Sequence, residues 1–196
     1  MKDNLKIAVI GCGGIGSYFI RSLSEMIKRD LIGLNRVNPM AIDIIDYDKV
    51  EEKNLLYQNF EIEDLDRNKA EVLADRTGYK AINIKIELAE QIAEYDFIII
   101  CADNNEVRKI IYEAGRPFLD LRASGKTIFA YLTQKDDIEY LELTKDNGQK
   151  GGCQRNEDIE ERHIQCGNRI IAEIGIQFLA DYLRGETKQK KLILTL

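Results

Sequence analysis

Short apolar runs alternate with amphipathic stretches along the first two thirds of the chain. The short runs are typical of buried strands, whereas the longer stretches repeat hydrophobic residues every three or four positions, as helices do. The predicted strands are Lys6–Ile10, Ala41–Asp46, Ala81–Ile86, Phe97–Cys101 and Phe118–Leu121. The predicted helices are Gly16–Arg29, Asp64–Thr77, Glu87–Glu94 and Asn105–Ala114. This alternation predicts an α/β fold whose mostly parallel sheet is covered by helices on both faces.

The pattern changes after Asp120, in the last third of the chain. The elements predicted there are an antiparallel hairpin of Thr127–Leu132 and Glu139–Leu143, a mobile glycine-rich loop at Asp146–Gly152, and a helix over Asn168–Leu183. No break in composition defines a second domain. We therefore expect a single domain over residues 1–196, with an α/β core at 1–125 and a C-terminal antiparallel extension at 126–196.

Composition and charge narrow the function classes. Of the 196 residues, 44% are hydrophobic and 32% charged, as in soluble globular proteins. The net charge of −6 argues against a nonspecific nucleic-acid binder, which needs a basic surface. No apolar run reaches the roughly 20 residues of a membrane helix, and the N-terminus does not read as a signal peptide. We expect a cytoplasmic protein that binds neither membranes nor nucleic acid.

A glycine-rich loop joins the first predicted strand to the first predicted helix. Its sequence is Gly11-Cys12-Gly13-Gly14-Ile15-Gly16, which fits G-x-G-x-x-G. Such glycines let the backbone approach a phosphate, and the helix N-terminus offers free N–H groups to it. In this context the motif predicts a Rossmann-like nucleotide site formed by Gly11, Gly13, Gly14 and Gly16. The alternative is that the glycines serve only close packing of helix and strand.

Two carboxylates follow strands of the predicted sheet and face the same edge. Asp46 ends the second strand, where an acid binds the hydroxyls of a ribose. Asp103 follows the fourth strand, and a carboxylate near phosphates requires a bridging cation such as Mg²⁺. Asp103 therefore favours ATP over a dinucleotide cofactor. The alternatives are a turn or cap role for Asp46 and Asp48, and a helix N-cap for Asp103.

A longer motif resembles the adenylating ThiF/MoeB/HesA family. Residues 46–58, Asp-Tyr-Asp-Lys-Val-Glu-Glu-Lys-Asn-Leu-Leu-Tyr-Gln, resemble the family signature D-x-D-x-V-x-x-x-N-L-x-R-Q. Lys69 follows on the next helix, and residues 101–104, Cys-Ala-Asp-Asn, resemble the family's C-T-D-N. The resemblance covers roughly Lys6 to Leu132 and is weaker beyond. It implies an ATP-dependent enzyme that joins a protein carboxyl terminus to AMP and releases pyrophosphate.

The same resemblance assigns roles to individual residues. Asp46 would hold the ribose, Lys69 the phosphates and Asp103 the magnesium ion. The remaining candidates for the nucleotide pocket are Asp48, Asn54 and Gln58. The implied partners are a small ubiquitin-like or sulfur-carrier protein and a second copy of the chain. The apolar tail Leu192–Leu196 would help to bind that second copy. The alternative is that the tail forms the last strand of its own sheet.

The sequence departs from the family pattern in two ways. Tyr57 stands where the family has a catalytic arginine, and a phenol carries no positive charge. A replacement could come from Arg36, Arg108, Arg122 or another subunit. The two C-x-x-C pairs that bind zinc in many relatives are also missing, so we expect no structural zinc site. Tyr57 favours one alternative, a catalytically impaired nucleotide-binding subunit or interaction module. The glycine loop permits another, an NAD(P)-binding oxidoreductase, which would leave Asp103 and residues 54–58 unexplained.

Cys153 is the candidate for a covalent intermediate. It lies between glycines and Arg155, directly after the predicted mobile loop, in a position that resembles the thioester- or persulfide-forming cysteine of relatives. Cys166 precedes the last predicted helix, whose N-terminus would also favour a thiolate. A third interpretation is that Cys153 only packs under the loop.

Overall fold

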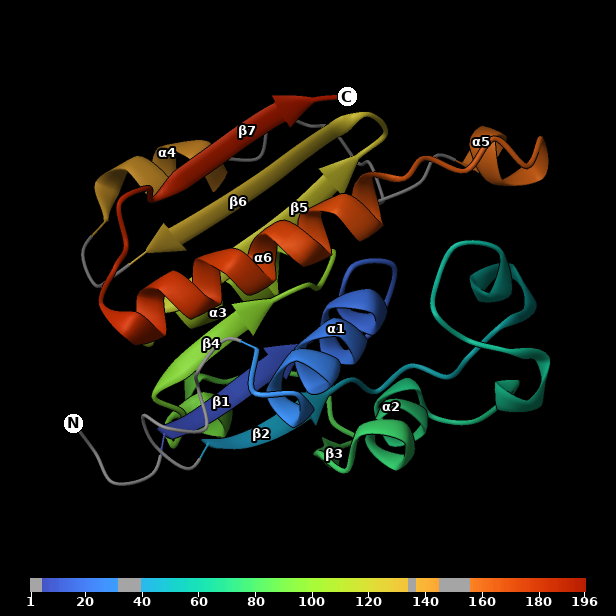
Figure 1. Ribbon diagram of the computed structural model, residues 1–196, viewed down its shortest axis with the longest axis horizontal. Coiled ribbons are helices and arrows are strands. Elements are labelled where there is room, and N and C mark those ends of the chain that lie inside the picture. Colours follow the sequence, from blue (N-terminus) through green and yellow to red (C-terminus); the bar gives the residue numbers. More distant parts are fainter. Residues whose placement is uncertain (1–4, 32–39, 134–136, 145–155) are drawn as a thin grey trace.

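The computed structural model describes residues 5–31, 40–133, 137–144 and 156–196, and shows a seven-stranded sheet of order β3-β2-β1-β4-β5-β6-β7 (Figure 1). The strands are β1 (Leu5–Ile10), β2 (Met40–Ile45), β3 (Lys80–Ile82), β4 (Phe97–Ile100), β5 (Phe118–Ser124), β6 (Thr127–Thr133) and β7 (Lys191–Thr195). The pairs among β1 to β5 are parallel, whereas β6 is antiparallel to both β5 and β7. The predicted Rossmann-like α/β fold with an antiparallel extension is confirmed.

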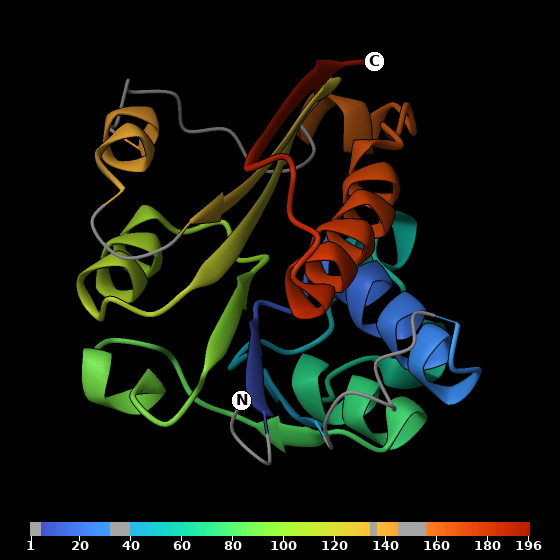
Figure 2. The ribbon, with the colours of Figure 1, turned by 60° about the vertical axis from the view of Figure 1, so that its left-hand side comes forward.

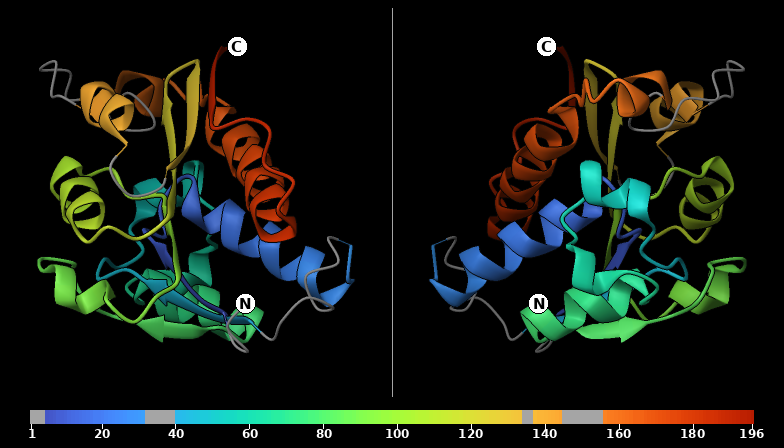
Figure 3. Two further views of the ribbon diagram at one scale, coloured as in Figure 1. Left: turned by 90° about the vertical axis from the view of Figure 1, so that its left-hand side faces the viewer. Right: turned by 90° about the vertical axis from the view of Figure 1, so that its right-hand side faces the viewer.

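Helices cover both faces of this sheet (Figures 2 and 3). They are α1 (Gly16–Lys28), α2 (Lys69–Thr77), α3 (Asn105–Glu113), α4 (Ile138–Thr144), α5 (Asn156–Glu160) and α6 (Gly167–Arg184), with 3-10 turns η2 (Glu52–Leu56), η3 (Ile62–Asp64) and η4 (Ala89–Ile92). Side chains alternate between the two faces of β1: Ile7 and Val9 pack in the core under α1, α2 and α6, whereas Ala8 and Ile10 pack in the core under α3 and α4.

The structure corrects the predicted hairpin. Residues 139–143 belong to helix α4, not to a strand. The turn at Gly125 instead joins β5 to β6, and β7 occupies the other edge of β6, so no edge of β6 remains for a third partner. Tyr140 anchors α4, because the residue is 1% exposed and its ring packs edge-on against that of Phe118, with the ring centroids 4.9 Å apart. The short alternating run had been compatible with either element.

Other elements also differ from the prediction: β5 runs to Ser124 instead of Leu121, the predicted helix Glu87–Glu94 is only the 3-10 turn η4, and α2 and β3 have other bounds. Helix α2 begins at Lys69 rather than at Asp64, because the side chain of Asn68 caps it by accepting a hydrogen bond from the Glu71 N–H. Asp64 ends η3 and forms a 2.5 Å ion pair with Arg76. Strand β3 ends at Ile82, which leaves residues 83–86 outside the sheet.

The C-terminal tail forms the last strand of its own sheet. β7 pairs with β6 from Thr127 opposite Thr195 to Tyr131 opposite Lys191. The tail therefore gives no separate argument for a second chain. None of the helices in the described part of the chain is both long and apolar enough to cross a membrane.

The glycine loop lies where the strand order reverses direction. β1 pairs with β2 on one side and with β4 on the other, so the loop after β1 opens between the ends of both neighbours. The Gly11 N–H donates to the carbonyl of Ile45, and the Cys101 N–H donates to that of Ile10. In open α/β sheets, ligands bind in the crevice at such a reversal.

Candidate nucleotide-binding site

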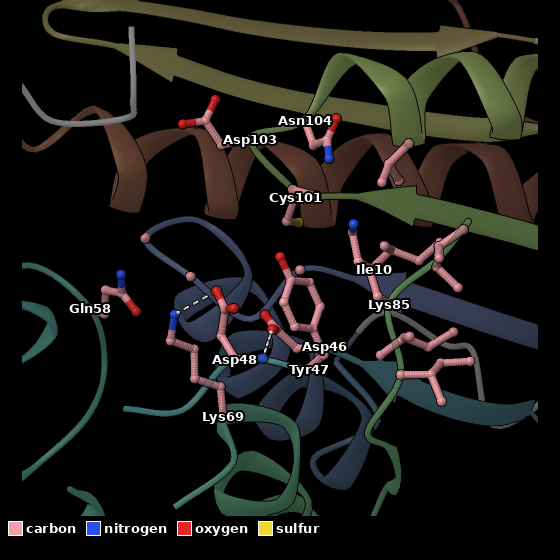
Figure 4. Close-up of a pocket in the computed structure, with 18 of the residues that line it drawn as sticks. Ile10, Asp46, Tyr47, Asp48, Gln58, Lys69, Lys85, Cys101, Asp103 and Asn104 are labelled. Atoms are coloured by element: carbon pink, nitrogen blue, oxygen red, sulfur yellow. Dashed lines mark hydrogen bonds and ion pairs between the residues drawn. The ribbon is translucent and has the colours of Figure 1, made fainter. Parts of the chain in front are cut away.

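A cleft of about 510 Å³ opens at the carboxyl edge of the sheet (Figure 4). It lies over the ends of β1, β2 and β4. The lining residues with polar or charged side chains are Asp46, Tyr47, Asp48, Lys53, Tyr57, Gln58, Lys69, Lys85, Asp103 and Asn104. The apolar part of the wall is formed by Ile10, Ile45, Ile84, Ile86, Cys101, Ala102, Val107 and Ile159. A cavity of this size, with one apolar wall and converging polar groups, is typical of a small-ligand site.

Asp46 supports the glycine loop from the end of β2. One carboxylate oxygen accepts the Cys12 N–H at 2.6 Å, and the other accepts the Asp48 N–H at 2.8 Å. Burial raises the pKa of Asp46 above its ordinary value, although these two donors and the nearby Lys69 act in the opposite direction. Each carboxylate oxygen has a second lone pair, so Asp46 can still accept a hydrogen bond from a ligand hydroxyl in the cleft.

Lys69 places a buried ammonium on the floor of the cleft. It is the first residue of α2 and only 7% exposed. Its Nζ atom lies 3.3 Å from a carboxylate oxygen of Asp48, and its backbone N–H donates to the Asp48 carbonyl (Figure 4). The Asn68 side chain fixes the segment by donating to the carbonyls of Asp46 and Asp48. An ammonium held in this way is positioned to bind an anionic ligand.

Asp103 lines the cleft from the β4 side, and a neighbouring residue caps α3. The Asn104 side chain accepts the Glu106 N–H at 2.8 Å, so it is Asn104 that fills the N-cap position considered for Asp103. Asp103 is exposed, but partial desolvation of its carboxyl raises its pKa, and the charge of Arg108 offsets part of this increase. Asp103 lies across the cleft from Lys69 (Figure 4).

The glycines of the loop divide into two groups. Gly11, Gly13 and Gly14 line the cleft, whereas Gly16 does not. A Cβ atom at Gly16 would overlap the carbonyl oxygen of Gly11, so this glycine allows α1 to pack closely on the loop. At Gly13 the nearest atom to an added Cβ is Gln58 Nε2 at 3.9 Å, which leaves the space above this backbone open.

The two candidate amide residues, Asn54 and Gln58, lie in different places. The Asn54 side chain accepts the Glu51 N–H and is 2% exposed, so it stabilises η2 and does not line the cleft. Gln58 lines the cleft, and its Oε1 atom has no hydrogen-bond partner among the described residues. A buried acceptor of this kind is suited to a ligand donor.

Two lysines of the cleft were not predicted from the sequence. Lys53 comes from η2 and Lys85 from the segment after β3, where it pairs with Glu87 at 3.2 Å. Bonding to Glu51 raises the pKa of Lys53. The position of Lys85 in the sequence could have indicated its place in the cleft. It follows a strand whose carboxyl end reaches the same edge of the sheet as Asp46. With Lys69, three cations surround a site in a chain of net charge −6.

A model of the ThiF family matches residues 3–120, which is more than half of the chain. The chain belongs to the ThiF family. The catalytic subunit of the NEDD8-activating enzyme E1 from Arabidopsis thaliana is 29% identical over 130 residues, or 61% of this chain and 26% of that protein. This ThiF-family chain thus spans about a quarter of that relative's length.

Solved structures share the fold. E. coli MccB with ATP superposes with a TM-score of 0.69 at 18% identity, covering 99% of this chain and 61% of MccB. MccB with MccA gives a TM-score of 0.70 at 18% identity, covering 99% of this chain and 61% of MccB. PaaA gives a TM-score of 0.67 at 18% identity, covering 98% of this chain and 61% of PaaA. The ThiF-family chain therefore spans about three fifths of the length of these proteins.

Tyr57, which stands where the sequence resemblance implies an arginine, lines the cleft. Two of the suggested replacements lie outside the lining. Arg108 donates to both carboxylate oxygens of Asp120 at 3.2 Å, and Arg122 donates to Asp120 at 2.7 Å. The fully buried Asp120 thus holds both guanidinium groups in an ion-pair network behind the site. Arg36 lies outside the described residues.

Cys12, Cys153 and Cys166 differ in what the structure shows of them. Cys153 is outside the described residues. Cys166 is exposed and occupies the N-cap position of α6. Cys12 is buried in the glycine loop, and burial raises its pKa well above the ordinary value, which disfavours the thiolate.

Proposed function

We propose that this chain binds ATP and Mg²⁺ in the cleft and adenylates the carboxyl terminus of a small ubiquitin-like or sulfur-carrier protein. The carrying observation is that Lys69 and Asp103 both line one cleft and lie on opposite sides of the glycine loop. A dinucleotide cofactor needs neither a metal-binding carboxylate nor a buried phosphate-binding lysine. A triphosphate that loses pyrophosphate benefits from both, because negative charge develops on the leaving oxygens.

The residues of the cleft fit ATP. Asp46 can accept from the ribose hydroxyls, and the open backbone at Gly13 gives the phosphates access to N–H groups at the start of α1. The unpaired Oε1 atom of Gln58 provides an acceptor within the same cleft. Lys69 is already desolvated, so exchanging part of its contact with Asp48 for a phosphate requires little reorganisation.

The residues also fit Mg²⁺ held jointly with the nucleotide. Among the described residues, no three His, Cys, Asp or Glu side chains gather into a metal site. A carboxylate such as Asp103 would therefore share the ion with phosphate oxygens and water, which is how Mg²⁺ is usually bound. The ion would supply charge neutralisation at the phosphates. Lys69 would hold them from the opposite side as the substrate carboxylate attacks the α-phosphorus.

The relatives support this function. The related E1 subunit is named for activating NEDD8, and MccB has been solved with ATP and with MccA. Because this chain covers only part of each, the target of adenylation is inferred from chemistry. A carboxyl terminus is the nucleophile that the proposed reaction requires.

A homodimer is part of the proposal, because a second subunit could supply the positive charge that Tyr57 lacks. Neither Arg108 nor Arg122 lines the cleft of its own chain. We expect light scattering to give the mass of a dimer at working concentration, and a monomeric mass would contradict this part of the proposal.

Tyr57 also supports a second candidate function, that of a nucleotide-binding subunit without adenylating activity. Incubation with ATP, Mg²⁺, labelled pyrophosphate and a small protein with a free carboxyl terminus separates the candidates. Exchange of label into ATP that depends on the small protein supports adenylation. ATP binding without exchange supports the second candidate, and binding of a nicotinamide nucleotide in preference to ATP would contradict both.

A further inference from the structure

Arg108 is a buried arginine of α3 whose guanidinium group binds three other residues. Arg108 is 6% exposed and does not line the cleft. Its Nε atom donates to both carboxylate oxygens of Asp120 at 3.2 Å, Nη1 donates to Asn105 Oδ1 at 3.2 Å, and Nη2 donates to the Ala102 carbonyl at 2.7 Å. The donors of a guanidinium group form a rigid planar fork, which fixes the relative positions of its partners. Arg108 therefore ties the start of α3 and the segment before it to β5.

The bond to Ala102 lies directly next to Asp103. The Ala102 carbonyl belongs to the peptide bond that joins these two residues, and a peptide bond is planar. A hydrogen bond to this oxygen thus fixes the plane from which the backbone of Asp103 continues. Because Asp103 is exposed, side-chain packing restrains its carboxylate little, and the backbone sets where it lies.

The glycine loop contacts the same segment. A Cβ atom added at Gly11 would lie 2.7 Å from the backbone nitrogen of Ala102 and 2.9 Å from the carbonyl carbon of Cys101. Ala102 is therefore held by the glycine loop, where the phosphates would bind, and by Arg108. A carboxylate and a phosphate that share one metal ion must lie at a fixed distance from each other. These two contacts at Ala102 set the distance between Asp103 and the loop.

We propose that Arg108 is a positioning residue, which holds the peptide bond before Asp103 so that this carboxylate can share Mg²⁺ with the phosphates of ATP. The inference rests on the proposed function. Arg108 does not line the cleft, so it acts through Asp103 and not on the ligand. Losing a group that orients a metal ligand typically lowers metal affinity or activity about 10- to 100-fold.

The test measures how much Mg²⁺ improves the binding of ATP. Calorimetric titration of the protein with ATP, once in EDTA and once in Mg²⁺, gives two dissociation constants, and their ratio is the metal advantage. We expect the original protein to bind ATP more tightly with Mg²⁺, and Asp103→Asn to lose this advantage. Arg108→Met should reduce the metal advantage about tenfold, while the affinity for ATP in EDTA stays within about twofold.

Arg122→Met is the matched control. Among the described residues, Arg122 donates to the same Asp120 carboxylate and to Tyr140 but makes no bond to Ala102. Asp120 keeps one guanidinium partner in either variant, so both proteins should fold, with lowered unfolding temperatures. Arg122→Met should keep the metal advantage. An equal loss in both variants would show that a loosened ion-pair network is the cause, against the proposal.

Arg108→Lys separates geometry from charge. Lysine keeps a positive charge beside Asp120, but a single ammonium group cannot span three partners as the planar fork does. We expect this variant to lose the metal advantage as Arg108→Met does. A full metal advantage in Arg108→Lys would show that charge alone is sufficient, and the positioning role would be wrong.

A double variant tests whether Arg108 acts through Asp103. Asp103→Asn combined with Arg108→Met should lose no more metal advantage than Asp103→Asn alone, and additive losses would overturn the proposal. An unchanged metal advantage in Arg108→Met would also overturn it and leave the proposed function intact. If the original protein binds ATP equally well in Mg²⁺ and in EDTA, the positioning role is wrong. If it does not bind ATP at all, the proposed function itself is wrong.

Discussion

Gly13→Ala separates ligand binding from folding. The added methyl group would point into the cleft, where the nearest protein atom, Gln58 Nε2, lies 3.9 Å away, an ordinary van der Waals distance. Gly13 is not among the glycines with positive φ, so alanine can adopt its backbone conformation. Because alanine restricts the unfolded chain, we expect the free energy of unfolding to stay unchanged or to rise by about 0.4–1 kcal/mol.

The effect on ATP affinity should be much larger. The methyl group occupies the space through which phosphate oxygens reach the loop N–H groups. Losing one hydrogen bond to a charged group costs about 1.5–3 kcal/mol, which corresponds to a dissociation constant roughly 10- to 150-fold higher. Calorimetric titration with Mg²⁺–ATP measures this change, and urea unfolding measures the stability.

Gly16→Ala is the matched control, because its methyl group would overlap the Gly11 carbonyl oxygen rather than enter the cleft. This variant should lose stability, whereas Gly13→Ala should lose only affinity. An unchanged ATP affinity in a stable Gly13→Ala protein would refute phosphate binding at the loop.

Three further predictions concern charge. Asp103→Asn and Lys69→Ala should each lower the rate of pyrophosphate exchange roughly 10²- to 10³-fold, and a fully active Asp103→Asn protein would contradict the metal-binding role. Asp120→Ala should lower the free energy of unfolding by about 3–5 kcal/mol in urea titrations, because Arg108 would remain buried without its carboxylate partner. A loss below about 1 kcal/mol would argue against the ion-pair network around Asp120. Burial raises the pKa of Tyr79 to about 12, so its proton is held more tightly in the folded state. The stabilisation from this proton is complete below about pH 10 and is lost as the pH rises toward 12. In Tyr79→Phe the free energy of unfolding should therefore fall less steeply over that pH range. An unchanged pH profile would contradict the effect of burial.

The parallel core could be predicted because its signals are local. Each buried strand is a short apolar run, and the glycine loop identifies the strand–helix junction at Gly11 to Gly16 without tertiary information. The positions of Asp46 and Asp103 in the cleft follow as well, since parallel strands end at one edge.

Other features of the fold and the site depend on tertiary contacts, which the sequence does not display. Residues 139–143 form a helix because both edges of β6 are occupied and Tyr140 finds a buried site. β3 ends at Ile82, so Lys85 lies beyond the sheet, whereas the apolar run 81–86 had predicted a strand that includes it. Arg108 lies on α3 and Asp120 on β5, and the sequence does not show that their side chains meet.

The central claim is that this chain converts a protein carboxyl terminus into an acyl adenylate. The most direct measurement traps that product. The chain is incubated with ATP, Mg²⁺, hydroxylamine and a small protein with a free carboxyl terminus encoded beside it. Hydroxylamine displaces AMP from an adenylated carboxylate and leaves a hydroxamate, which mass spectrometry detects on the small protein. We expect a hydroxamate that requires ATP and is lost in Asp103→Asn. Tight ATP binding with no hydroxamate, or a hydroxamate formed equally without ATP, would contradict the account.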